Sequence, residues 1–173
     1  PTGAGGSVLF ELSADAHSAV LDVARRAGVT PFMVIHAGLA LTLSALGAGD
    51  DIVIGTVTAG RDDVRLEQLV GMFVNTIALR TDLSGDPTFD ELLARVRGAD
   101  LAAFDAQRAS IEAIIDALAP TRVRGRNPLF QVMLSADAVS TAGRSLEAAL
   151  QLEHVAAAPI EIADAVAKFD LTF

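Results

Sequence analysis

The spacing of apolar residues along the chain changes between a helical period and a strand period, which predicts both kinds of element. Ser13 is a suitable N-cap for a helix over residues 14–27, after which a glycine ends the helical pattern. Thr30 followed by Pro31 predicts the start of a second helix, which we expect to stop at Gly47. Its apolar stripe, expected to face the core, consists of Phe32, Ile35, His36, Leu39, Leu43 and Leu46.

Two more helices are predicted in the middle of the chain. Pro87 and Thr88 open a long segment of helical periodicity that reaches residue 104. Residues 111–118 repeat this pattern over a shorter length, and Pro120 ends it. We therefore expect a long helix followed closely by a short one.

Segments rich in Val, Ile and Phe predict the strands. Residues 52–58 are β-branched and almost entirely apolar, which is typical of a strand buried on both faces. Further strands are expected over residues 8–12, 72–80, 129–135, 150–155 and 168–173, with loops over 60–68 and 136–144. The order of the elements predicts a layered α/β fold, and the pattern leaves the topology of the sheet open.

One polar side chain interrupts the apolar face of the strand predicted over residues 72–80. Read with period two, Asn75 shares a face with Phe73, Ile77 and Leu79. An amide among such neighbours lowers stability unless its donors and acceptors are paired. Asn75 therefore either bonds neighbouring backbone or points into a polar cleft.

Composition and charge limit the class of partner. The 173 residues suit one domain or one lobe, and the hydrophobic fraction of 51% argues against disorder. The net charge of −9 argues against nucleic acid and anionic membrane surfaces as partners. No apolar run reaches the ~20 residues of a membrane span, and residues 1–8 lack a basic start, so we expect a soluble cytoplasmic protein. Without cysteine, the chain has no thiol nucleophile, disulfide or thiolate zinc site.

Three sequence blocks carry a resemblance to a known family. They are Leu69–Thr76, Arg126–Met133 and Lys168–Thr172, and their order and spacing resemble the C-terminal lobe of condensation domains of non-ribosomal peptide synthetases. The resemblance implies a chloramphenicol-acetyltransferase-like α/β fold of layered sheet and helices. It also implies that residues 1–173 are a partial condensation domain, without the N-terminal lobe and without the last strands and helix.

The resemblance implies a reaction and a set of partners. Condensation domains form a peptide bond when the amine held on an acceptor carrier attacks the thioester held on a donor carrier. This chain would supply one wall of the tunnel and a docking surface for the donor and acceptor carrier domains, beside the N-terminal lobe of the same domain. The phosphopantetheine arms would belong to the carriers, so we expect the chain itself to bind no cofactor.

The family's reactive histidine belongs to a His-His-x-x-x-Asp-Gly motif in the N-terminal lobe, and that motif is absent here. The three histidines are His17, His36 and His154, and none is adjacent to another. We interpret His36 as a core or edge residue, with a role in a site as the alternative. The sequence also has no zinc spacing and no phosphate loop. We therefore predict no catalytic or metal-binding residue and no activity for the isolated chain.

Five residues in or near the family blocks are candidates for lining the tunnel or for holding the motifs in place: Arg61, Asn75, Thr76, Arg126 and Asn127. Arg61 is either an exposed charge or a contact between lobes. The five donors of Arg126 suit a lock that binds carbonyls or a carboxylate beside the rigid Asn127-Pro128 pair. With Arg122 and Arg124, Arg126 also forms a basic cluster, which is either a solvated loop or a surface for an acidic carrier.

The sequence departs from the family pattern at residues 106–112. Where the family has His-Gln-Asp-x-Pro-Phe-Glu, this chain reads Ala-Gln-Arg-Ala-Ser-Ile-Glu, so only Gln107 and Glu112 match. Two alternatives are an epimerisation domain, which shares the fold, and a non-catalytic lobe that binds carriers or acts as a scaffold. The block Arg126–Met133 favours condensation over epimerisation. The strand expected over residues 168–173 would leave an unpaired edge, which favours self-association of the chain.

Overall fold

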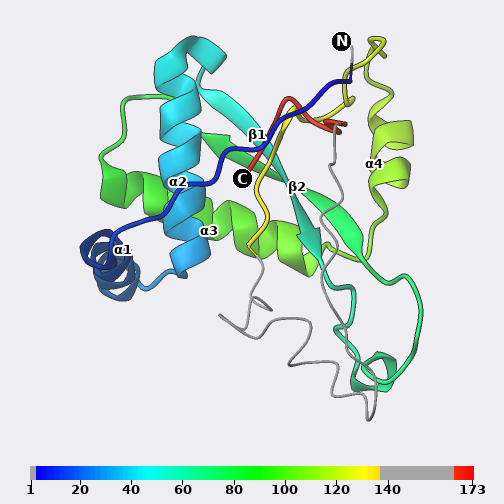
Figure 1. Ribbon diagram of the computed structural model, residues 1–173, viewed down its shortest axis with the longest axis horizontal. Helices are drawn as coiled ribbons and strands as arrows, with labels where there is room; N and C mark the ends of the chain where they lie inside the picture. Colours follow the sequence, from blue (N-terminus) through cyan, green and yellow to red (C-terminus); the bar gives the residue numbers. More distant parts are fainter. Residues whose placement is uncertain (1–2, 137–165) are drawn as a thin grey trace. The chain divides into compact units, whose positions relative to one another are not determined.

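The computed structural model describes residues 3–136 and 166–173, which fall into two units. The larger unit comprises Leu9–Ser135 and Phe169–Phe173, and it combines helices with a four-stranded sheet (Figure 1). Its helices are α1 (Ala14–Ala27), α2 (Pro31–Leu43), η1 (Ser44–Ala48), η2 (Val64–Leu66), α3 (Phe89–Asp105) and α4 (Ile111–Leu118). Its strands are β1 (Asp51–Thr58), β2 (Asn75–Asp82), β3 (Val132–Met133) and β4 (Leu171–Thr172).

The sheet has the order β2-β1-β3-β4. Strand β2 runs antiparallel to β1, whereas β3 runs parallel to both β1 and β4. Ile54 in the middle of β1 is paired with Leu79 on one side and Val132 on the other. Residues 52–58 therefore form a strand with neighbours on both edges. The predicted burial holds for the face of Ile52 and Ile54, whereas Val57 on the other face is 41% exposed.

The helices begin where side chains can accept from free backbone N–H groups, as the sequence predicts. The hydroxyls of Ser13 and Thr30 accept from backbone N–H groups in the first turns of α1 and α2. Thr88 and Glu91 form a reciprocal capping box at the start of α3. Gly28 ends α1 in the left-handed conformation, with φ of 63°.

One face of the sheet carries the main core. Ile52 and Ile54 of β1 join a buried cluster that includes Ala37 of α2 and Leu92 and Val96 of α3. Because side chains alternate along a strand, Gly55 lies on the opposite face. The Phe130 ring covers that glycine so closely that a Cβ atom there would lie 2.2 Å from its Cε2. Phe130 thus covers the second face of β1 at Gly55.

A buried polar chain joins the helices to the sheet. His36 of α2 lies with its Nδ1 3.0 Å from Oδ1 of Asp100 in α3, and its Nε2 lies 3.1 Å from the Thr81 hydroxyl in β2. All three residues are almost completely buried. The ring serves both neighbours when Nδ1–H donates to Asp100 Oδ2 at 3.2 Å and Nε2 accepts from the hydroxyl, while Asp100 Oδ1 has no hydrogen-bond partner among the described residues. The interpretation of His36 as a core residue is therefore confirmed.

Several strand predictions are wrong or too long. Residues 8–12 form no strand, and Leu9 is 97% exposed, because no neighbouring strand pairs with this segment within the described residues. In the smaller unit, Ala4 makes an isolated antiparallel bridge to Val166. The strand expected from residue 72 begins at Asn75, and those expected over 129–135 and 168–173 shrink to β3 and β4. The predicted loop over 136–144, apart from its first residue, and the strand over 150–155 lie outside the described residues.

Helix α2 differs from its predicted stripe. Its buried residues are Met33, Val34, His36, Ala37 and Ala40, whereas Ile35 and Leu46 are exposed. The reason is that α2 contacts α1, α3 and β1, so it buries a wider surface than one stripe. Element η1 extends to Ala48, but helical backbone geometry is lost at Gly47, which has φ of 93°, at the residue where the sequence predicts the helix to stop. Within the described part, Pro31–Ala48 is long and apolar enough for a membrane span by composition, a test that core helices also pass.

Candidate functional site

Asn75 and Thr76 line a cleft of about 690 Å³ at the start of β2. Its other walls are the β1–β2 loop (residues 59–74), the α3–α4 connector (residues 106–110) and the first turn of α4. A groove of about 730 Å³ between α1 and α3 is similar in size but contains none of the five candidate residues. We therefore place the candidate site at the cleft beside β2.

The Asn75 side chain ties the start of β2 to the α3–α4 connector. Its Nδ2 donates to the carbonyl oxygens of Gln107 at 2.5 Å and Ala109 at 2.9 Å. Its Oδ1 accepts from the backbone N–H of Thr76 at 2.9 Å. The amide thus bonds backbone, one of the two roles that the sequence left open, although the main partner is the connector. A direct role in lining a substrate tunnel stays a prediction.

Arg61 holds the β1–β2 loop together from within. Its guanidinium donates to the carbonyl oxygens of Leu66, Glu67 and Leu69, the last at 2.9 Å. The guanidinium carbon also lies 4.5 Å from the centroid of the Phe73 ring, which adds a cation–π contact. Arg61 is therefore a structural residue of this loop, and its contact with another lobe stays a prediction.

Gly60 allows the loop to fold back on itself. It has φ of 62°, and a Cβ atom there would lie 1.8 Å from the carbonyl oxygen of Phe73. The two ends of the loop thus approach each other at a point where only glycine fits.

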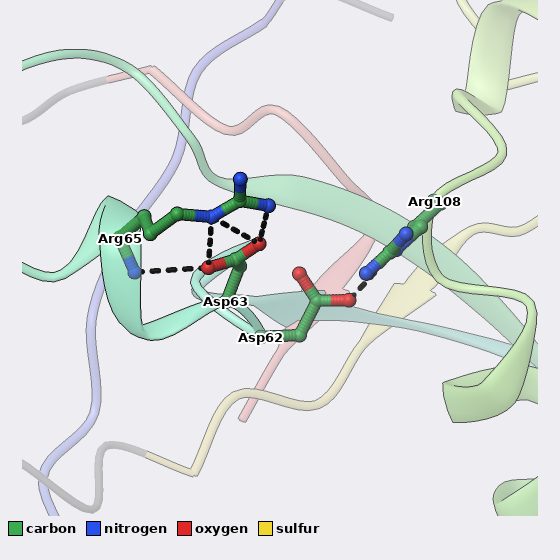
Figure 2. A network of polar contacts seen from close by, with 4 residues as sticks. All are labelled: Asp62, Asp63, Arg65 and Arg108. Atoms are coloured by element: carbon green, nitrogen blue, oxygen red, sulfur yellow. Dashed lines mark hydrogen bonds and ion pairs between the residues drawn. The ribbon is translucent and has the colours of Figure 1, made fainter.

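Two neighbouring carboxylates of the loop bind different arginines (Figure 2). Asp62 Oδ2 accepts from Arg108 Nε of the connector at 2.8 Å. Asp63 accepts from Arg65 Nε of the same loop at 3.0 and 3.1 Å, and from its backbone N–H at 2.9 Å. One pair therefore joins two segments, and the other stays within the loop.

Within these pairs, hydrogen bonds shift the pKa of Asp63 and of Arg108 towards the charged form. Hydrogen bonds from Arg65 hold the pKa of the Asp63 carboxyl below its ordinary value. The hydrogen bond to Asp62 raises the pKa of the Arg108 guanidinium. Asp63 and both arginines are thus ionised at neutral pH. The lining of the cleft combines Asp62, Asp63 and Arg108 with apolar side chains such as Phe73 and Ile111.

Arg126 and Asn127 lie elsewhere, before β3. The Arg126 side chain is exposed and makes no hydrogen bond or ion pair with the described residues, so it does not form the predicted lock there. Asn127 takes that role, because its Oδ1 accepts from the backbone N–H groups of Leu129 and Phe130 at 3.0 and 3.3 Å. Its carbonyl oxygen also accepts from Gln131 Nε2 at 2.7 Å. Asn127 thus shapes the turn into β3.

No histidine among the described residues lines the cleft. His17 is exposed on α1, His36 is buried in the core, and His154 lies outside the described residues. Across residues 3–136 and 166–173, no group of three His, Cys, Asp or Glu side chains has an arrangement that could hold a metal ion. The described lining of the cleft includes the carboxylate and hydroxyl side chains of Asp62, Glu112 and Ser110, and its volume suits binding of a substrate or partner.

Sequence reasoning missed Asp62 and Arg108. Both are charged residues in segments read as loops, and they lie 46 positions apart in the chain. The one available signal was the departure at residues 106–112, where Arg108 stands in place of the family's Asp.

Comparison with known proteins identifies the family. The family described as Condensation domain matches residues 2–173. The chain belongs to the condensation domain family. It is 43% identical over 175 residues to a dimodular nonribosomal peptide synthase of Bacillus subtilis (strain 168), covering 99% of this chain and 7% of that protein. It is 41% identical over 169 residues to an isonitrile lipopeptide synthase of Mycobacterium tuberculosis (strain ATCC 25618 / H37Rv), covering 98% and 6%.

Solved structures share the fold of this condensation domain chain. A four-domain nonribosomal peptide synthetase bound to AMP and glycine matches with a TM-score of 0.76 and 27% identity, over 81% of this chain and 10% of that one. The X-domain from teicoplanin biosynthesis matches with a TM-score of 0.64 and 37% identity, over 68% and 26%. The predicted chloramphenicol-acetyltransferase-like α/β fold is thereby confirmed. The chain spans only a small part of each of these relatives.

Proposed function

We propose that this condensation domain chain is the C-terminal lobe of a peptide-bond-forming enzyme, in which the cleft beside β2 forms part of a tunnel wall. The observation that carries the proposal is that the cleft is built around the family block Leu69–Thr76, with Asn75 fixing its far wall. The reaction joins an amine on an acceptor carrier to a thioester on a donor carrier. Since the chain has no cysteine, both thioester sulfurs come from partners.

The contribution of this chain is to bind and orient. Holding two reactants in the correct geometry is itself a large part of catalysis for a reaction between bound groups. The rigid β1–β2 loop and the fixed α3–α4 connector suit this role, because their hydrogen bonds are already made before any substrate arrives. The reactive histidine would come from the N-terminal lobe.

The β1–β2 loop also offers a surface for that lobe. Val64, Val70 and Met72 are 78%, 104% and 87% exposed, although the loop that carries them is hydrogen-bonded from within by Arg61. Exposed apolar side chains on a fixed backbone are typical of an interaction surface. We assign the N-terminal lobe of the same domain to this surface. Donor and acceptor carriers in the cytoplasm complete the proposed set of partners, and the exposed Arg122, Arg124 and Arg126 suit an acidic carrier.

The test is reconstitution of dipeptide formation. Donor and acceptor carriers are loaded with aminoacyl thioesters and mixed with this chain alone, or with the whole synthetase module that contains it. Mass spectrometry of the acceptor carrier should show the dipeptide with the module and none with the chain alone. Dipeptide formed by the chain alone would overturn the assignment. No dipeptide from a module with an intact His-His-x-x-x-Asp-Gly motif would favour a scaffold instead.

A further inference from the structure

Asp62 and Asp63 are adjacent, yet only Asp62 is bound to another segment (Figure 2). Its partner, Arg108, projects from the α3–α4 connector, whereas the partner of Asp63 lies within the β1–β2 loop. Within residues 3–136, the Asp62–Arg108 ion pair is the one hydrogen-bonded or ionic contact between the loop and the connector. The Asp62–Arg108 pair can therefore fix the loop relative to the connector, whereas the Asp63–Arg65 pair cannot.

Hydrogen bonds hold the backbone of the α3–α4 connector on both sides of Arg108. Asn75 holds the carbonyl groups on both sides of it, those of Gln107 and Ala109. The backbone N–H of Gln107 also donates to Phe104 at 3.2 Å, which continues the end of α3. The position of the Arg108 backbone is therefore set by β2 and α3, and not by the loop.

The loop, in turn, behaves as one body. Arg61 joins its middle to its start through three carbonyl oxygens, and Gly60 brings its first residues close to Phe73 at its other end. These contacts hold the loop together but do not tie it to the connector. Asp62 lies two residues after Gly60 and provides that outside contact.

We infer that Arg108 is a positioning residue, whose ion pair with Asp62 sets the position of the β1–β2 loop over the cleft. The inference deepens the proposed function, on which its catalytic consequence rests. An acidic side chain at position 108 would repel Asp62, whereas the Arg108 guanidinium attracts it.

The expected effects are moderate because the pair is exposed. The Arg108 side chain is 77% exposed, and an exposed pair of this kind changes an equilibrium by about two- to five-fold. Salt should weaken it, since exposed charges are screened over about 8 Å at physiological ionic strength. The loop should then sample more positions as the salt concentration rises.

Paired spin labels test the position of the loop directly. The chain has no cysteine, so Val70→Cys and Ala117→Cys place one label on the loop and one on the exposed side of α4. With labelled protein diluted in unlabelled protein, Arg108→Gln should broaden the distance distribution, whereas Arg65→Gln should leave it narrow. The exchange variant Arg108→Asp with Asp62→Arg should narrow it again. An unchanged distribution in Arg108→Gln, or equal broadening in Arg65→Gln, would overturn the inference.

Dipeptide formation by the whole module tests the consequence for the reaction. Arg108→Gln should lower kcat/KM by about two- to five-fold, with Arg65→Gln near the parent value and the exchange variant recovered. A parent module that forms no dipeptide would contradict the proposed function, while the label distances would still decide the role of Arg108. If Arg108→Gln broadens the distance distribution but leaves kcat/KM unchanged, Arg108 positions the loop and has no role in the reaction.

Discussion

Nδ1 of His36 lies 3.0 Å from Oδ1 of Asp100, and both side chains are completely buried. The pair connects α2 with α3, and Thr81 extends it to β2. Burial of a carboxyl group is tolerated only when a partner satisfies it, so each member depends on the other. These residues hold the helical layer in register with the sheet that carries Asn75.

We predict that His36→Leu lowers the free energy of unfolding by about 3 kcal/mol, because it leaves the Asp100 carboxyl buried without its partner. Asp100→Asn should cost about 1 kcal/mol, since its amide oxygen still accepts from Nδ1. Urea denaturation at neutral pH measures both. Equal losses in the two variants would mean that shape, and not the hydrogen bond, is the important property of this pair.

Asn75→Leu should lower stability and module activity together, because the carbonyl groups of Gln107 and Ala109 lose their donors. We expect a loss of about 1–3 kcal/mol in unfolding free energy. Asn75→Asp should be worse, since it places a carboxylate against two carbonyl oxygens.

Thr76→Val is the matched control, because it also lines the cleft but its hydroxyl makes no hydrogen bond within the described residues. Thermal melting and dipeptide formation are measured on the same preparations. If Asn75→Leu melts like the parent protein and still loses turnover, Asn75 acts by lining the tunnel and not by holding the connector.

Gly55→Ala should destabilise the chain by about 1–3 kcal/mol, because the added methyl group would overlap the Phe130 ring on the second face of β1. Gly98→Ala makes the same chemical change on α3, where no atom lies within 4 Å of the new Cβ. It should stabilise by about 0.5–1 kcal/mol through helix propensity. Denaturation midpoints of the two variants should therefore move in opposite directions.

Acid should remove part of the stability. Hydrogen bonds from Arg80 lower the pKa of Asp51 in the folded chain, so its contribution is present above the unfolded pKa of about 4. That contribution is lost as the pH falls through the lower, folded pKa. Asp51→Asn should therefore flatten the decline of unfolding free energy below about pH 4, relative to Asp105→Asn, whose side chain makes no ion pair within the described residues. Parallel slopes in the two variants would contradict this role.

The isolated chain should self-associate, because Val70 and Met72 are exposed on a loop that is already ordered. Sedimentation at several concentrations should show a dimer or a mixture. Val70→Ser with Met72→Ser should shift it towards the monomer. If the chain is a monomer at every concentration and binds no hydrophobic dye, the exposed Val70 and Met72 side chains do not cause self-association.

Local signals explain which elements could be predicted. Ser13, Thr88 and Ser110 cap their helices by bonding residues in the next turn, so the sequence alone locates them. Strand ends depend on partners that are distant in sequence, so residues 72–74 read as strand although β2 begins at Asn75. The same limit applies to residues 8–12, which have a strand pattern but no partner strand.

The candidate site was partly predictable for the same reason. Asn75 attracted attention because a lone amide in an apolar pattern needs partners, and it has them. Its partners, and the pairing of Asp62 with Arg108, depend on how α3 returns to the start of β2. Arg126 shows the opposite case, since its side chain is exposed and makes no hydrogen bond or ion pair with the described residues, although its type and motif suit such a role.

The position of β1 in the sheet has a consequence for synthesis on the ribosome. The pairing of β1 with β2 needs only residues up to 82. The other edge of β1 stays unpaired until Val132 of β3 has been synthesised. At about 5–20 residues per second, that edge stays open for roughly 3–10 s. An open, apolar strand edge is a template for wrong pairing. A translational pause between these two points should therefore lower the yield of folded protein, even though every native contact of the finished chain is unchanged.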